Sequence, residues 1–85
     1  MVLKRSVRWP TTPIVTVTAV DPKGSAADSG IQVNDIIVQV QRTPVSEPDQ
    51  ALRLIGVQAS LQRQFAAVLI ERGKERFWIS LAIPT

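Results

Sequence analysis

The stretch AVDPKGSAADSGIQVNDIIVQV, from Ala19 to Val40, predicts a strand end, a short helix, a turn and a second buried strand. Ser25 precedes Asp28 by three residues, which is the spacing of a capping box at a helix start. Gly30 stands where so short a helix must end, because glycine enters the left-handed region without a side-chain penalty. The stretch therefore predicts a strand–helix–strand corner with one apolar side.

Hydrophobic periodicity outside this corner predicts the remaining elements. Residues 1–9 alternate weakly and predict at most an exposed strand, and the prolines at positions 10 and 13 predict an extended connection after it. Strict alternation over 14–20 predicts a strand, residues 65–70 a strand covered on both faces, and residues 76–81 a last alternating strand. The predicted order is strand, strand, short helix, strand, long helix, strand, strand.

The long helix is predicted to begin at Ser46, because Asp49 follows three residues later in a second capping box. Its residue spacing gives two apolar arcs. One arc is assigned to the core and consists of Ala51, Leu52, Ile55 and Ala59. The other arc is either further core or one wall of a groove, and consists of Gln50, Leu54 and Val57.

Length and composition bound the possible functions. Eighty-five residues with 45% hydrophobic content make one small folded domain with room for one shallow site. The chain contains neither cysteine nor histidine, which excludes thiol nucleophiles, Ser-His-Asp arrangements and thiolate or imidazole metal sites. We therefore assign no catalytic residue, no metal ligand and no cofactor. The longest apolar run, 65–70, is far shorter than the ~20 residues of a membrane span.

The net charge of +3 includes a basic stretch near the amino terminus, where Lys4, Arg5 and Arg8 stand beside Trp9. Such a stretch could follow a nucleic-acid backbone and stack a base. It could equally be an edge strand that its charges keep soluble. We favour the edge strand and predict no nucleic-acid partner.

The series DPKGSAADSGIQVNDIIVQVQRTPVSEPDQAL resembles the signature of bacterial PDZ domains, most closely those of HtrA/Deg-type envelope serine proteases. The resemblance covers residues 13–82. Asn34 stands where the family usually has glycine, and Arg42-Thr43 replaces the usual Asn-Gly tip. The resemblance implies an α+β fold, a small, partly open β-barrel or sandwich of about five strands with one short and one long helix. Residues 1–85 would form a single PDZ domain, with 1–12 as the groove strand or a truncated lead-in.

The resemblance also implies a noncatalytic module that binds an extended peptide, often a carboxy terminus, between the first strand and the long helix by strand addition. Carried over by position, the peptide-binding residues are Val2, Leu3, Lys4, Gln50, Leu54 and Val57. The family's carboxylate-binding loop contains a glycine that residues 1–9 lack. We therefore expect the chain to start at the end of that loop.

The parent protein implied by the resemblance is a serine protease in the periplasm or cell envelope, whose attached catalytic domain the module regulates or supplies with substrates. Two other PDZ settings stay open. One is an adaptor or scaffold in a secretion or envelope-assembly component, and the other is a site-2 or carboxy-terminal-processing protease. A basic nucleic-acid module is a more distant alternative.

Overall fold

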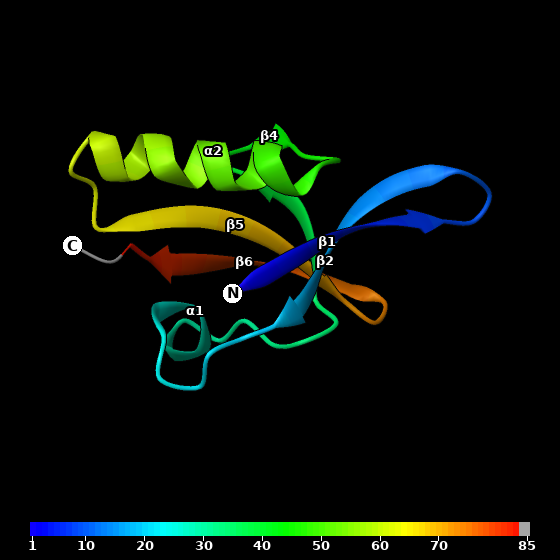
Figure 1. Ribbon diagram of the computed structural model, residues 1–85, viewed down its shortest axis with the longest axis horizontal. Helices are drawn as coiled ribbons and strands as arrows, with labels where there is room; N and C mark the ends of the chain where they lie inside the picture. The colour runs from blue at the N-terminus through cyan, green and yellow to red at the C-terminus, as the bar shows by residue number, and fades with distance from the viewer. Residues whose placement is uncertain (84–85) are drawn as a thin grey trace.

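The computed structural model of the chain, which describes residues 1–83, contains an antiparallel sheet, one short helix and one long helix (Figure 1). Alternating apolar residues form the strands, and the 3.6-residue apolar repeat forms the long helix. The elements in chain order are β1 (Val2–Arg8), β2 (Thr12–Ala19), α1 (Ser25–Asp28), β3 (Ile36–Val40), β4 (Thr43–Pro44), α2 (Pro48–Ser60), β5 (Phe65–Arg72) and β6 (Glu75–Ala82).

The sheet is open and has the strand order β1-β2-β3-β5-β6, with the two-residue β4 paired to β3; these are the six strands within residues 1–83. In the same range β1 pairs with β2 alone, so β1 is an edge strand. The predicted α+β fold with a partly open sheet, a short helix and a long helix is confirmed. The structure adds β4 to the predicted strands.

The core lies on one face of this sheet, under α2. Val15 and Val17 of β2 and Val68 and Ile70 of β5 are completely buried, and Ala51 of α2 packs in the same cluster. Burial of these aliphatic side chains is the main source of stability in a chain of this composition.

The prediction that residues 65–70 are covered on both faces is wrong. Ala66, Val68 and Ile70 are buried, but Phe65, at the start of β5, is 54% exposed. The helices and the core occupy only one side of this strand, and antiparallel sheets commonly leave the other face in water. The continuous apolar run therefore reflects an apolar outer face and not a second covering layer.

The corner around α1 is fixed by glycine and asparagine geometry. The predicted Ser25–Asp28 capping box is wrong, because Gly24 is the N-cap and no side chain caps the helix. The predicted helix end is confirmed, since Gly30 has a φ of +100°. Asn34 has a φ of +76°, which explains how it fills a position where glycine is usual.

A buried ion pair ties this corner to β5. The carboxylate of Asp35 is almost completely enclosed and accepts hydrogen bonds from Arg72 Nε at 2.8 Å, Arg72 Nη2 at 2.7 Å and the Gln32 amide at 2.9 Å. Burial raises the pKa of Asp35, but the hydrogen bond from Arg72, the Gln32 amide and the charge of Arg72 together hold this pKa below its usual range. Arg72 also donates to the Gly30 carbonyl at 2.9 Å. The loop between α1 and β3 is thus locked to the sheet.

The start of α2 also differs from the prediction. Glu47 is the N-cap, Pro48 is the first helical residue and no side chain caps the helix, so the Ser46–Asp49 capping box is wrong. Instead, the side-chain oxygen of Gln50 accepts a hydrogen bond from the Ser46 amide at 3.1 Å. Gln50 therefore satisfies one backbone donor near the helix start in place of the predicted hydroxyl.

The first two strands form a long hairpin that projects from the sheet (Figure 1). The predicted extended connection across the two prolines is wrong, because β2 begins at Thr12 and contains Pro13, which lies opposite Val7. On the β3 side, only Val15 and Thr16 of β2 are paired. Pro13 lies outside this paired segment, so its missing amide proton costs no hydrogen bond between β2 and β3.

Candidate functional site

The candidate site is the space between the edge strand β1 and the helix α2. Because β1 pairs with β2 alone among the described residues, its other edge carries backbone donors and acceptors that a further strand can use. The helix lies next to this edge, and the side chain of Arg5 on β1 reaches the side chain of Glu47 at the start of α2. An edge strand beside a helix is the geometry that strand addition requires.

A cavity of about 380 Å³ opens at the beginning of β1. Its walls come from the amino terminus, α1 and the loop before it, α2 and the end of β6, and its residues are Met1, Asp21, Gly24, Ser25, Ala26, Leu52, Ile55, Leu81 and Ala82. The helix contributes Leu52 and Ile55, and β6 contributes Leu81. The cavity is large enough for one bulky apolar side chain and lies at one end of the β1 edge.

The predicted strand residues Val2, Leu3 and Lys4 all lie in β1. Leu3 is half-buried and packs against the core, opposite Val17 of β2, whereas Val2 and Lys4 are exposed. The structure therefore places all three on the edge strand, and only Leu3 turns its side chain toward the core face.

The predicted helix residues Gln50, Leu54 and Val57 do not line the cavity. Gln50 hydrogen-bonds the backbone of Ser46 and Pro44, Leu54 packs against the core, and Val57 is 45% exposed. Their role in peptide binding stays a prediction, and the structure does not bring them together with Met1.

The helix residues that do line the cavity, Leu52 and Ile55, were assigned to the core arc. For Leu52 that assignment is wrong, because the residue is 49% exposed; Ala59, in the same arc, is also exposed. The buried residues Ala51 and Gln58 fix the rotation of α2, and this rotation turns Leu52 toward the cavity. Helical spacing shows which residues share an arc, but it contains no signal for which arc meets β1.

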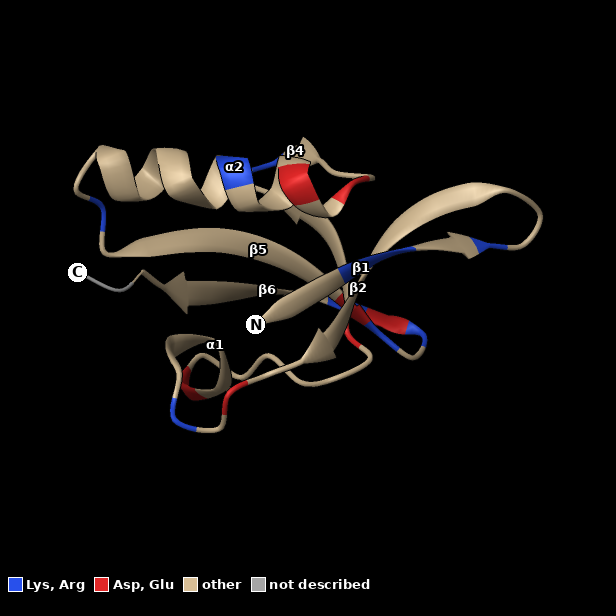
Figure 2. Ribbon diagram, in the orientation of Figure 1, with Lys and Arg blue, Asp and Glu red and all other residues tan. Residues whose placement is uncertain are grey.

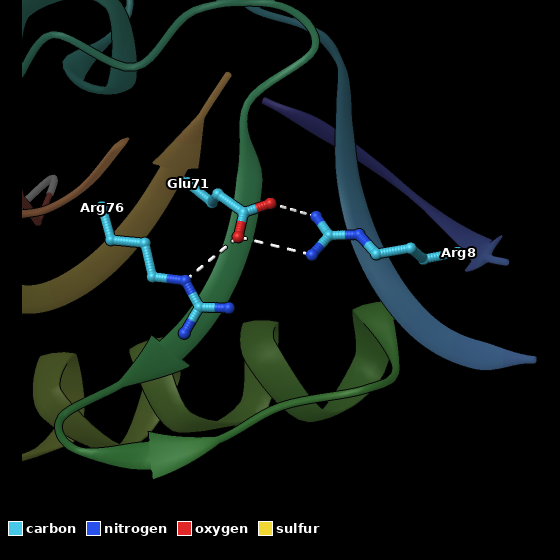
Figure 3. Close-up of polar contacts among 3 residues, drawn as sticks. All are labelled: Arg8, Glu71 and Arg76. Atoms are coloured by element: carbon cyan, nitrogen blue, oxygen red, sulfur yellow. Dashed lines mark hydrogen bonds and ion pairs between the residues drawn. The ribbon is translucent and has the colours of Figure 1, made fainter. Parts of the chain in front are cut away.

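A charge cluster on the outer face of the sheet ties β1 to β5. Figure 3 shows the Glu71 carboxylate between Arg8 of β1 and Arg76 of β6, with Arg76 Nε 3.0 Å from Glu71 Oε1. The hydrogen bond from Arg8 lowers the pKa of Glu71, burial partly opposes this effect, and Arg76 lowers the pKa further. The end of β1 away from the cavity is therefore anchored to the body of the domain.

The charges that flank the groove have opposite signs. Figure 2 shows cationic residues along β1 and acidic residues at the amino-terminal end of α2.

Within residues 1–83, no three side chains of the metal-binding types gather into a possible ion site. Over the same residues, neither helix has the length and apolar character needed to cross a membrane.

Comparisons with known proteins bear on the family and the fold. Residues 16–65 match the family model described as the PDZ domain. A search of curated proteins finds no relative that matches this chain. Among solved structures, the chain is similar to an HtrA3 PDZ domain bound to a phage-derived ligand, FGRWV, with a TM-score of 0.69 and 23% identity over 94% of this chain and 85% of that one.

Proposed function

Because this chain belongs to the PDZ domain family, we propose that it is a noncatalytic module that binds an extended peptide between β1 and α2. One observation carries the proposal: the unpaired edge of β1, within the described residues, starts at an apolar cavity walled by α2. A peptide strand would pair with the β1 edge, and one apolar side chain would enter the cavity beside Met1, Leu52 and Ile55.

The direction of the peptide follows from the position of the cavity. Because the cavity lies at the start of β1, a peptide that runs antiparallel to β1 and is anchored there by its last residue extends back toward Arg8. The HtrA3 PDZ domain, which has the same fold, was solved with the five-residue ligand FGRWV. So short a ligand buries little surface, and we expect micromolar binding, about -8 kcal/mol.

We further propose that the module belongs to an HtrA/Deg-type serine protease of the cell envelope and presents peptides to its catalytic domain. Support comes from the likeness in fold to an HtrA3 PDZ domain and from the signature between residues 21 and 52. The complete gene tests this proposal. A serine-protease domain upstream supports it, whereas a transmembrane helix with no protease domain indicates an adaptor or scaffold.

Titration of the isotopically labelled domain with the peptide FGRWV tests the groove. We expect amide shifts to concentrate in residues 2–7 and 48–55. Leu52→Glu should weaken binding at least about tenfold, because it places a charge in an apolar pocket. Leu61→Glu, at the exposed carboxy-terminal cap of α2, is the control and should leave binding unchanged.

Val57→Glu decides between the two helix faces. Val57 is about as exposed as Leu52 but lies on the arc that does not line the cavity. If Val57→Glu abolishes binding and Leu52→Glu does not, the peptide lies on the other side of α2 and the groove described above is wrong. Absence of any shift in β1 would remove the proposed function altogether.

A further inference from the structure

We propose that the ion pair between Arg5 and Glu47 bridges the peptide groove and makes it selective for peptides with an acidic side chain upstream of the anchored residue. This inference rests on the proposed function, because it concerns the occupant of the same groove. Arg5 Nε lies 3.3 Å from Glu47 Oε1, and their side chains are 59% and 48% exposed. The pair joins the same two elements, β1 and the start of α2, between which the peptide would lie.

The side chain of Arg5 projects on the groove side of the sheet. Arg5 lies opposite Val15 of β2, and Leu3 lies opposite Val17. The side chains of directly opposed residues in an antiparallel pair lie on the same face of the sheet. Val15 and Val17 are completely buried, so this face is the one that carries the core and α2. Lys4, between Leu3 and Arg5, points to the other face.

The distance from the cavity locates the peptide residue involved. Arg5 is four residues beyond Met1, about 13 Å along an extended strand. Glu47 is five residues before Leu52, about 7.5 Å along the helix axis. A bound strand would therefore reach the ion pair two to four residues before its anchored residue. Because side chains alternate, the peptide residues two and four positions before the anchored residue are the ones that face α2.

The surrounding charges determine which sign is preferred. A peptide that enters must displace one partner of the ion pair. Glu47, when released, stands in water at the start of α2, where the helix dipole stabilises negative charge. Arg5, when released without a new partner, is an unpaired cation in a domain of net charge +3. An acidic peptide side chain that replaces Glu47 gives Arg5 a new partner. A basic peptide side chain that pairs with Glu47 leaves Arg5 without one.

The expected effect is small because both side chains are largely exposed. Exposed ion pairs contribute little in water, so we expect a peptide with aspartate at the favoured position to bind about two- to fivefold more tightly than one with asparagine. A peptide with lysine there should bind more weakly than the asparagine peptide. The differences should shrink as ionic strength rises.

The experiment uses the full chain and FGRWV-based peptides that carry aspartate, asparagine or lysine at each position two to four residues before the last. Affinities are measured by fluorescence anisotropy at low salt and at about 0.5 M salt. In Arg5→Gln the aspartate preference should disappear, and in Glu47→Gln the aspartate peptide should bind more tightly than in the unmodified chain. Lys74→Gln and Asp49→Asn are matched controls, because each removes the same charge from an exposed residue that forms no ion pair among residues 1–83.

Two kinds of failure are distinguishable. If the asparagine peptides bind along β1 but Arg5→Gln keeps the aspartate preference, or lysine peptides bind best, the selectivity inference is overturned and the proposed function stands. If Lys74→Gln and Arg5→Gln reduce the preference equally, the effect comes from net charge and the inference is again overturned. If no peptide shifts the amides of β1, the proposed function and this inference both fail.

Discussion

Replacement of Arg72 by leucine should destabilise the domain and also change how its stability depends on pH. Arg72 donates two hydrogen bonds to Asp35, whose side chain is 2% exposed, while the side chain of Arg72 is 37% exposed. In the variant, Asp35 stays enclosed with only the Gln32 amide as a donor. The charge that loses its partner is therefore the buried one, which is the costly case.

The magnitude follows from this asymmetry. Removal of one partner from a buried ion pair costs about 3–5 kcal/mol, and we expect about 3 kcal/mol because Asp35 keeps one hydrogen bond and can take up a proton. That is a large share of the roughly 5–15 kcal/mol by which small domains are stable. Asp35→Asn should cost less, about 1–2 kcal/mol, because the half-exposed Arg72 can turn to water.

The pH dependence has opposite signs in the two proteins. In the unmodified chain the pKa of Asp35 lies below its unfolded value of about 3.9, so its stabilisation is present above that pH and is lost as pH falls through the folded pKa. Without Arg72, burial outweighs the Gln32 hydrogen bond and raises the folded pKa. The destabilisation of Arg72→Leu should then diminish as pH falls, because the folded state gains the proton more readily.

Urea unfolding followed by far-ultraviolet circular dichroism at several values between about pH 7 and about pH 3 measures this effect. Arg63→Leu, which removes an arginine from the exposed loop after α2, is the control and should change the free energy of unfolding by less than about 0.5 kcal/mol. A difference between Arg72→Leu and the unmodified chain that stays constant across this range would refute the assignment of the buried charge to Asp35.

Three further predictions concern stability. Arg42→Gly should raise the free energy of unfolding by about 0.5–1 kcal/mol, because Gln41 and Arg42 form the hairpin turn before β4 with φ values of +52° and +67°; urea unfolding checks this. Ile70→Ala should cost about 2–5 kcal/mol in the same measurement, since Ile70 is completely buried. Glu71→Gln should lower the free energy of unfolding by about 1–2 kcal/mol, because it removes the carboxylate that holds Arg8. It should also speed amide hydrogen exchange in β1 and β2, and unchanged exchange would contradict that anchoring role.

The sequence predicts the corner well because its constraints are local. A left-handed φ at Gly30 and the turn at Asn34 each depend on one residue type, and the alternation of β2 and β6 depends on neighbouring positions. Both capping boxes fail because the N-cap lies one residue away from the predicted serine, one residue earlier than Ser25 in α1 and one residue later than Ser46 in α2. Gly24 and Glu47 occupy the N-cap positions.

The candidate site is harder to predict because it depends on how distant elements are oriented. The spacing in α2 places Leu52 and Ile55 on one arc and Gln50, Leu54 and Val57 on another, but in the structure Leu54 packs against the same core as Ile55. Only packing against the sheet decides that Ala51 and Gln58 point inward and that Leu52 turns toward the cavity. The Arg5–Glu47 pair joins residues 42 positions apart, and nothing in the local sequence indicates it.

The basic residues of β1 connect the stability of this strand with its proposed ligand. An edge strand can pair with any extended chain, including the same strand of a second copy. Two antiparallel copies of β1 would bring Lys4, Arg5 and Arg8 against like charges, which opposes self-pairing. The same charges would attract the acidic peptide proposed above, and Arg5 and Arg8 meanwhile hold β1 to α2 and β5 through Glu47 and Glu71. The side-chain contacts of Arg5 and Arg8 thus hold β1 in place without using the backbone donors and acceptors of its outer edge, which stay available to the proposed peptide.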